Sequence, residues 1–563
     1  MRCFITTTLF ILFALIADAQ YVFHTLDMRK KIPSTFFRTF DYQLLNGNFY
    51  MVANPNGGTH PWISDGSTLG TSQLANAGSS YQVMISDDKP IIKNSTGTEL
   101  TLFEYYYATS SIAQYQIWIT DGTTTGTKRL TTTTNFKYQT HKLAFKNKFY
   151  FTATDTTYGE ELWESDGTTA GTKLFADLVP GKASSGAAPV YADGTRMFLY
   201  VFTPTTGGEL WCTDGTIAGT YMVKDINPGS AGINNTFGGT GYILKLHNIY
   251  YFWANNGTNG WELWRTDATP SGTYMVKDIV PGSGSCRFQT GYAVANNLLF
   301  FGVDDGVHGT ELWATDGTVA GTRMIKEINT AKALARTNAS PNYFTVYNGE
   351  VYFSADDSIH GAELWKTNGE ASGTVMVKDI CANGSSTPKY LHVYKKHLFF
   401  TADNPCGANG EGKTREIYYT DGTAAGTVMI KPLTATIAGG AVNTSGFFEY
   451  QGRLFFNAAY AGGKDDLWYI GDTILPAITN IEQIAIEETT LYPNPAHHNF
   501  TIKTTTAFKT GSVTLTDITG RVVKTEKLYN NEQTISLQGI APGIYIADVW
   551  LDDKRSTQKL VVE

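Results

Sequence analysis

Cysteine and charge are both scarce in this chain. Only five cysteines occur among 563 residues, which excludes a disulfide framework as the main source of stability, and no cysteine–histidine spacing suggests zinc. Charged residues make up 17% of the chain, the net charge is −8 at pH 7, and no basic run is present. The composition therefore gives no indication of a nucleic-acid partner.

Long apolar runs are missing beyond the N-terminus. The run from Phe4 to Ala17 has 14 residues, which is too short to span a bilayer. Arg2 precedes it, and Ala17-Asp18-Ala19 fits a small-x-small cleavage site. We therefore predict a signal peptide at residues 1–19, a mature chain from Gln20, and no transmembrane segment in the mature chain.

Motifs of common catalytic centres are absent as well. The chain has no G-x-S-x-G, no H-E-x-x-H and no P-loop, so nothing indicates the enzyme classes that use them. A glycosidase needs only two carboxylates roughly 5 to 10 Å apart, and no sequence pattern excludes such a pair. We predict no catalytic residue and no cofactor, which favours a non-enzymatic protein without deciding the question.

One twelve-residue segment recurs through most of the chain. It reads Glu-Leu-Trp-Ala-Thr-Asp-Gly-Thr-Val-Ala-Gly-Thr at 311–322, and versions of it lie at 209–220, 262–273, 363–374 and 416–427. A period near fifty residues predicts one four-stranded propeller blade per repeat. The aromatic anchors, spaced 45 to 56 residues apart, are Trp62, Trp118, Trp163, Trp211, Trp264, Trp313, Trp365, Tyr418 and Trp468.

Each repeat predicts four short strands with a defined register. In the unit from 342 to 380 the strands are expected at 343–347, 351–355, 363–367 and 375–380, bounded by turn residues. Folding about the loop 317–320 places Trp313 opposite Met324 and Glu311 opposite Lys326, as a sulfur–aromatic pair and an ion pair. The same offsets predict the pairs Trp211–Met222, Trp264–Met275, Trp365–Met376, Tyr418–Met429, Glu209–Lys224, Glu262–Lys277, Glu363–Lys378 and Glu416–Lys431.

The polar residues of the repeat fit a turn. We expect Gly317 and Gly321 to adopt positive φ, and Asp316 to cap its own turn. The alternative is that Asp316 and its equivalents bind a metal or a substrate, which requires several of them to converge. Because each aspartate belongs to a different predicted blade, the structural role is the favoured interpretation.

The repeat resembles the ELWxxDGT family of secreted Bacteroidetes proteins. The copies that begin at Glu161, Glu209 and Glu311 keep the full string, whereas those at Trp62 and Trp118 lack the Glu-Leu start. The resemblance covers roughly residues 36–470. It implies a propeller-like repeat array and supplies no catalytic residues.

We predict an all-β chain with nine four-stranded propeller units in residues 20–471, and eight units as the alternative. The last repeat lacks a fourth strand, and the alternating segment Tyr21–Leu26 is expected to take that place and close the ring. The segment 81–138 is the least regular. Its Tyr105-Tyr106-Tyr107 fit either an inner strand or an exposed surface.

A different module follows the repeats. Residues 472–490 are predicted to be a linker, and residues 491–563 a small Ig-like β-sandwich, because turns separate short alternating segments. These segments are 499–503, 512–517, 522–527, 533–537, 544–551 and 557–562.

The module carries a set of short motifs from its first residues to its last. They are the closing segment 559–562 and the residues Tyr492, Pro493, Asn494, Pro495, Gly520 and Gly543. With these motifs the module resembles the type A C-terminal sorting domain of the type IX secretion system. The resemblance implies Sec export, passage across the outer membrane by the type IX machinery, and attachment or release at the cell surface.

Several residues are candidates for a binding site or a crosslink. Two loops carry aspartates that are candidates for calcium, with turn capping as the alternative. His308 and His360 follow these aspartates and are expected to be turn residues. Trp253 and Trp261 are candidates for sugar stacking, with packing between blades as the alternative. The calcium candidates are Asp304, Asp305, Asp356 and Asp357, and the predicted disulfide joins Cys381 and Cys406.

Two functions remain open. The first is a secreted or cell-surface interaction or adhesion protein, in which the propeller binds an unknown glycan or protein. The second is a secreted polysaccharide hydrolase or lyase. Acidic side chains that converge at the mouth of the ring would favour the second.

Overall fold

The computed structural model describes residues 22–25, 42–53, 59–67, 70–75, 81–84, 89–108, 113–131, 142–233, 243–330, 338–382, 384–404, 414–430, 446–460, 464–471, 489–505, 507–517, 522–552 and 554–563. Two compact units are distinguished, one comprising Tyr21–Gly471 and the other including Asp472–Glu563. The predicted signal peptide, residues 1–19, lies outside the described residues.

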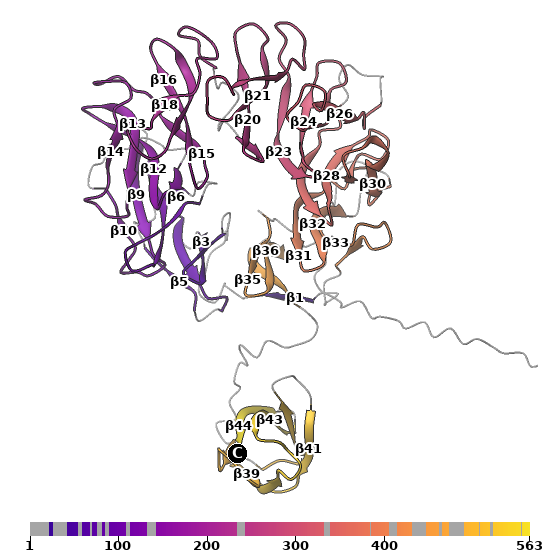
Figure 1. Ribbon diagram of the computed structural model, residues 1–563. Coiled ribbons are helices and arrows are strands. Elements are labelled where there is room, and N and C mark those ends of the chain that lie inside the picture. The colour runs from indigo at the N-terminus through magenta and orange to yellow at the C-terminus, as the bar shows by residue number, and fades with distance from the viewer. Residues whose placement is uncertain are drawn as a thin grey trace, which may run out of the picture. The chain divides into compact units, whose positions relative to one another are not determined.

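The described part of Tyr21–Gly471 forms nine antiparallel sheets, and Figure 1 shows them side by side in a ring. In seven of these sheets, four strands that are consecutive in the chain pair in order. The first three are β2 (Tyr42–Leu45), β3 (Asn48–Ala53), β4 (His60–Ser64) and β5 (Ser72–Gln73); β11 (Lys142–Phe145), β12 (Lys148–Asp155), β13 (Gly159–Ser165) and β14 (Lys173–Ala176); and β15 (Ala188–Ala192), β16 (Met197–Thr203), β17 (Gly207–Thr213) and β18 (Tyr221–Met222).

The other four regular sheets continue the pattern through the middle of the chain. They are β19 (Leu244–Leu246), β20 (Ile249–Asn255), β21 (Trp261–Thr266) and β22 (Tyr274–Lys277); β23 (Arg287–Ala295), β24 (Leu298–Asp304), β25 (Thr310–Thr315) and β26 (Arg323–Lys326); β27 (Asn342–Tyr347), β28 (Glu350–Asp356), β29 (Ala362–Thr367) and β30 (Val375–Lys378); and β31 (Lys389–Tyr394), β32 (His397–Asn404), β33 (Thr414–Thr420) and β34 (Val428–Met429). A 3-10 turn, η2 (Ala371–Gly373), joins β29 to β30.

The least regular sheet lies in the segment that gave the weakest repeat signal. The ten-residue strand β8 (Glu99–Ala108) pairs along one edge with two short strands, β6 (Tyr81–Met84) and β7 (Ile91–Lys93). Its other edge pairs with β9 (Ala113–Thr120), which pairs in turn with β10 (Lys128–Arg129). Tyr105 is fully buried in β8, which is paired along both edges, so it lies in an inner strand of the sheet and not on the surface.

The ninth sheet closes the ring. Strands β35 (Phe448–Tyr450), β36 (Arg453–Tyr460) and β37 (Lys464–Gly471) come from the end of the repeat region. The fourth strand is β1 (Val22–Thr25), which pairs antiparallel with β37 and places His24 opposite Tyr469. The prediction that the N-terminal segment fills the missing position is confirmed. This pairing leaves no free edge on β37, because β36 covers its other side.

The predicted aromatic–methionine register is confirmed in five repeats. Trp313 lies opposite Met324, and the corresponding pairs are Trp211–Met222, Trp264–Met275, Trp365–Met376 and Tyr418–Met429.

Four of the five predicted glutamate–lysine ion pairs are wrong. A β-bulge between Leu312 and Trp313 shifts the register by one residue, so that Lys326 lies opposite Leu312 and not Glu311. The same shift occurs where Glu262–Lys277 and Glu363–Lys378 were expected. For Glu209–Lys224, the lysine Nζ bonds the carbonyl of Thr273 in the next repeat instead. Lys431, the predicted partner of Glu416, lies outside the described residues.

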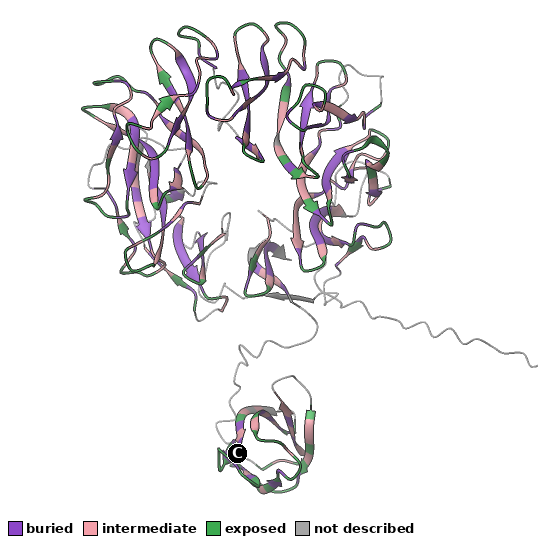
Figure 2. Cartoon of the chain, in the orientation of Figure 1, coloured by how far each residue is buried: buried purple, intermediate pink, exposed green. Residues whose placement is uncertain are grey.

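Buried side chains gather between adjacent sheets. Figure 2 shows buried residues along the strands and exposed residues mainly in the loops. Leu263 of β21 and Phe301 of β24, for example, lie in neighbouring sheets and belong to one apolar cluster. The described residues contain no helix of the length and hydropathy needed to cross a membrane.

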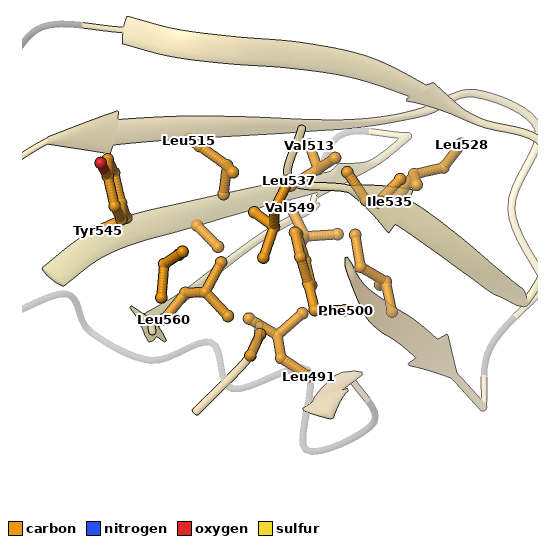
Figure 3. Packing of buried hydrophobic residues seen from close by; sticks show 14 of the residues in the cluster. Leu491, Phe500, Val513, Leu515, Leu528, Ile535, Leu537, Tyr545, Val549 and Leu560 are labelled. Carbon is orange, nitrogen blue, oxygen red and sulfur yellow. The ribbon is translucent and has the colours of Figure 1, made fainter. Parts of the chain in front are cut away.

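The C-terminal unit consists of two sheets around one core. One sheet has the order β38 (Thr489–Tyr492), β39 (Asn499–Thr504), β42 (Glu532–Ser536), and the other the order β41 (Val522–Leu528), β40 (Gly511–Asp517), β43 (Gly543–Leu551), β44 (Lys554–Val562). Figure 3 shows Phe500 and Val549, one from each sheet, in the shared cluster. Strand β38 begins two residues inside the predicted linker 472–490.

Candidate functional site

The aspartate of the repeat is bonded within its own turn. Asp316 Oδ1 accepts the backbone N–H of Thr318 at 2.9 Å and the Thr318 hydroxyl at 2.7 Å. These bonds lower the pKa of Asp316. Gly317 has φ +90°, as predicted. The same N–H bond to an aspartate recurs at Asp65, Asp121, Asp166, Asp214, Asp267 and Asp421.

The second glycine of the turn has a different role from the one predicted. Gly321 does not adopt positive φ. Instead, a Cβ on Gly321 would lie 1.9 Å from Asp316 Oδ1, so that only glycine leaves room for the capping carboxylate. The two threonines that flank the turn are hydrogen-bonded to each other, Thr315 to Thr322, at 2.7 Å. The polar residues of the repeat are therefore used by its own hairpin.

The aromatic anchors lie between sheets. Trp313, on β25, is 7% exposed and packs with Tyr251 and Leu263 of the preceding sheet. Trp211, Trp264, Trp365 and Tyr418 pack in the same way against the sheet before their own. Trp163 packs on the sheet of β8, and Trp468 on the sheet of β32. The remaining anchors, Trp62 and Trp118, also lie at sheet boundaries.

The glutamate of the repeat is fully buried and fixes the loop that leads to the next sheet. Glu311 Oε2 accepts the backbone N–H of Ile328 at 2.8 Å, and Oε1 accepts that of Asn329 at 3.2 Å. Burial raises the pKa of Glu311 to about 7. The pKa values of Glu209, Glu262 and Glu363 are raised to about 7 for the same reason, and that of Glu161 is raised as well.

The lysine that was expected to pair with this glutamate reaches the next sheet. Lys326 Nζ donates to the carbonyl of Thr374 at 2.8 Å and lies 5.8 Å from the ring centroid of Trp365. Lys224, Lys277 and Lys378 make the equivalent bond to the carbonyls of Thr273, Thr322 and Thr427. The lysine thus ties neighbouring sheets together.

The calcium candidates lie in two separate loops with equivalent geometry. Asp304 Oδ1 accepts the N–H of Gly306, while Asp305 Oδ1 accepts those of Val307 and His308. Asp356 and Asp357 make the corresponding bonds in the next sheet. No group of three or more acidic, histidine or cysteine side chains placed to hold a metal occurs among the described residues. Calcium binding here stays a prediction.

Each of these loops also holds a histidine in contact with its aspartate. His308 Nδ1 lies 2.7 Å from Asp305 Oδ2, and His360 Nδ1 lies 2.8 Å from Asp357 Oδ2. The hydrogen bond to the carboxylate raises the pKa of both histidines. The histidines thus close their own loops, which is the turn role expected from the sequence.

The candidate sugar-stacking tryptophans are buried. Trp253 and Trp261 are each 8% exposed, and Trp253 stacks in parallel on Phe288 of the next sheet at 4.8 Å. Both line an apolar cavity of about 40 Å³. Packing between sheets accounts for both residues.

The cysteines divide into two groups. Cys212 and Cys286 are buried free thiols, whereas Cys381 is disulfide-bonded. Cys406 lies outside the described residues, so its pairing with Cys381 stays a prediction.

One group of side chains was missed by the sequence reasoning. Tyr343 and Tyr390 lie in the first strands of adjacent sheets and have φ values of +57° and +56°. Nearby, Arg415 on β33 forms an ion pair with Asp403 at 2.8 Å and donates to the carbonyl of Thr387 at 3.0 Å. The sequence held one signal that could have found them. When the first strands β23, β27 and β31 are aligned, Gly291 occupies the position of the two tyrosines.

The sorting motif forms one structural unit with the end of the chain. Asn494 Oδ1 accepts the N–H of Val561 at 2.8 Å, and Asn494 Nδ2 donates to the carbonyl of Lys559 at 2.6 Å. Tyr492, which precedes cis Pro493, donates its hydroxyl to Glu532 on β42. Pro495 also follows a cis bond, Gly543 begins β43, and Gly520 lies outside the described residues. The opening and closing pieces of the motif are therefore in direct contact.

Comparison with known families identifies this C-terminal unit. Residues 490–563 match the family of secretion system C-terminal sorting domains. A protein that carries this domain is secreted by the type IX system to the cell surface, and this holds for the chain described here. A search of curated proteins found no match.

Solved structures resemble the chain only distantly. PorZ, a surface component of the type IX secretion system of Porphyromonas gingivalis, is 13% identical with a TM-score of 0.31, over 93% of this chain and 75% of PorZ. Prolyl oligopeptidase B from Galerina marginata is 12% identical with a TM-score of 0.36, over 77% of this chain and 58% of the peptidase. TM-scores this low carry no argument about blade number or function.

Proposed function

We propose that the mature chain is a non-enzymatic cell-surface binding protein. Its nine sheets are the blades of a single propeller built from ELWxxDGT repeats, and the propeller is the scaffold that binds a glycan or a protein. The Ig-like C-terminal domain is the secretion and anchoring signal, and residues 1–19 are the signal peptide. The export assignment rests on the family match at residues 490–563.

One observation carries this proposal. The side chains that recur in the repeat are used by the fold: Asp316 caps its turn, Glu311 holds a loop, and Trp313 packs between sheets. Recurrence in this chain therefore reflects architecture. Specific recognition must come from residues that differ between repeats, which is how repeat scaffolds vary their ligands on a common frame.

The test is to incubate the purified mature chain with a panel of polysaccharides and to measure retention and soluble products together. We expect the chain to be retained on at least one polymer, or on a protein array probed in parallel, without release of products. Release of oligosaccharides from any polymer would overturn the proposal and establish the hydrolase or lyase alternative.

Calcium is tested separately. Isothermal titration of the mature chain with calcium, before and after chelation, should show heat if the loops at Asp304 and Asp356 bind the ion. Absence of heat in both titrations would remove calcium from the account without affecting the binding proposal.

A further inference from the structure

Two tyrosines of this ring adopt a backbone conformation that bulky residues rarely take. Tyr343 on β27 and Tyr390 on β31 have φ values of +57° and +56°, and each lies where a β-bulge shifts the register of its strand. In the preceding sheet the equivalent position on β23 is Gly291, whose φ of +152° lies outside the left-handed region that the two tyrosines adopt. Glycine adopts the left-handed region without strain, whereas tyrosine does not.

The tyrosines that serve the fold behave differently. Tyr347 and Tyr394, each four residues further along the same strands, donate their hydroxyls to the carbonyls of Lys396 and Gly452, both at 2.6 Å. These bonds link one sheet to the next. The hydroxyls of Tyr343 and Tyr390, by contrast, have no hydrogen-bond partner among the described residues.

The two rings form a continuous aromatic surface. Strands β27 and β31 are in contact, and the rings of Tyr343 and Tyr390 pack edge to face, 5.8 Å apart with 61° between their planes. Both side chains are partly exposed. Figure 1 shows β31 on the side of its sheet that faces the middle of the ring.

The charged side chains beside the rings, Arg415 and Asp403, are paired with each other. The pKa of Tyr343 is raised by burial and by Tyr390, and the charge of Arg415 acts against this shift. Arg415 is paired with Asp403 at 2.8 Å, and its Nη2 also donates to the Thr387 hydroxyl at 3.0 Å. The surroundings are thus polar but carry little net charge, which does not favour an anionic ligand.

We propose that Tyr343 and Tyr390 form a platform on which the proposed binding function acts, and that the ligand is a neutral glycan. An aromatic face offers apolar contact to the C–H side of a pyranose ring, while the free hydroxyls bond its hydroxyl groups. Residues with strained backbone angles cluster at ligand-binding sites, which supports this role for the two tyrosines.

The test compares stability with binding in the full mature chain. The variants are Tyr343→Gly and Tyr390→Gly, with Tyr347→Phe as the matched control on the same strand. The neutral probes are cellohexaose, maltohexaose and chitohexaose, and the acidic probe is hexagalacturonic acid. Thermal unfolding and isothermal titration are measured for every protein.

We expect at least one neutral probe to bind the wild-type chain, and both glycine variants to weaken that binding by about tenfold or more. Their melting temperatures should equal or exceed that of the wild type, because glycine relieves the strain. Tyr347→Phe should lower the melting temperature and leave binding unchanged.

Binding of the acidic probe alone, no binding of a neutral probe, or glycine variants that bind as tightly as wild type would each overturn this inference. A clear fall in melting temperature of both glycine variants would do the same, since it would show a packing role. None of these results touches the proposed function, which fails only if a probe is cleaved.

Discussion

At the scale of single residues, the sequence predicted contacts within the hairpin but not contacts between sheets. The pairing of Trp313 with Met324 follows from loop length alone. The pairing of Glu311 with Lys326 does not form because a bulge, which has no sequence signal of its own, moves the lysine by one position. The buried Glu311 instead accepts the backbone N–H of Ile328, and Lys326 donates to the carbonyl of Thr374 in the neighbouring sheet.

The buried glutamates make stability depend on pH. Burial raises the pKa of Glu311 from its ordinary value of 4.5 to about 7, so the folded chain holds this proton more tightly than the unfolded chain. The stabilisation is complete below the unfolded pKa and is lost as the pH rises through 7. We expect Glu311→Gln to reduce the loss of unfolding free energy between pH 5 and pH 8 by roughly 1–3 kcal/mol.

Urea unfolding of the wild-type and variant chains at both pH values measures this effect. The two chains should be closest in stability at pH 5, because Glu311 is then protonated and, like the glutamine amide, presents one carbonyl oxygen to the two N–H groups. Identical pH dependence in the two chains would show that Glu311 does not titrate in this range.

The close contact at Gly321 gives a second test at this scale. Gly321→Ala places a Cβ against the Asp316 carboxylate, which must leave its capping position, and should cost about 1–3 kcal/mol. Gly194→Ala is the control, since Gly194 has no positive φ and nothing lies within 4 Å of its Cβ position. Chemical denaturation should leave this control near wild type; equal losses in both variants would argue against the turn geometry.

At the scale of elements, most strands were predictable because each repeat alternates and ends in turn residues. The predicted strand 343–347 differs from β27 by one residue at its start. The sheet of β8 was not predictable, because its first strand is divided into β6 and β7 and no repeat copy shows this division. Tyr343 and Tyr390 were missed for a related reason. Tyrosine is common in strands, and only the positive φ of these two residues is unusual.

A double-mutant cycle can test whether Lys326 bonds the next sheet or pairs with Glu311, as the sequence predicted. Lys326→Met should cost about 1 kcal/mol, because it removes the hydrogen bond to the Thr374 carbonyl. Combined with Glu311→Gln, the losses should add to within about 0.5 kcal/mol, since the two side chains are not paired. If urea unfolding gave a coupling energy well above that value, the two side chains would form the ion pair that the register excludes.

At the scale of the whole molecule, the C-terminal unit carries the export address. The sequence was sufficient here because the motif pieces are contiguous and specific, and the structure adds that Asn494 joins the first piece to the last. We expect a chain that ends at Gly471 to fold but to remain in the periplasm. A reporter fused to residues 472–563 should reach the medium or the cell surface, as fractionation and protease accessibility will show. Surface exposure of the truncated chain would contradict this assignment.

The proposed propeller depends most on closure of the ring by the N-terminal strand. His24 and Tyr469 are direct partners across β1 and β37, at a separation that suits a disulfide between antiparallel strands. The measurement is peptide mapping of the double variant His24→Cys, Tyr469→Cys under non-reducing conditions. We predict a crosslink between these two positions within a single chain. Free thiols at both positions, or a crosslink that joins two chains, would contradict the closed ring.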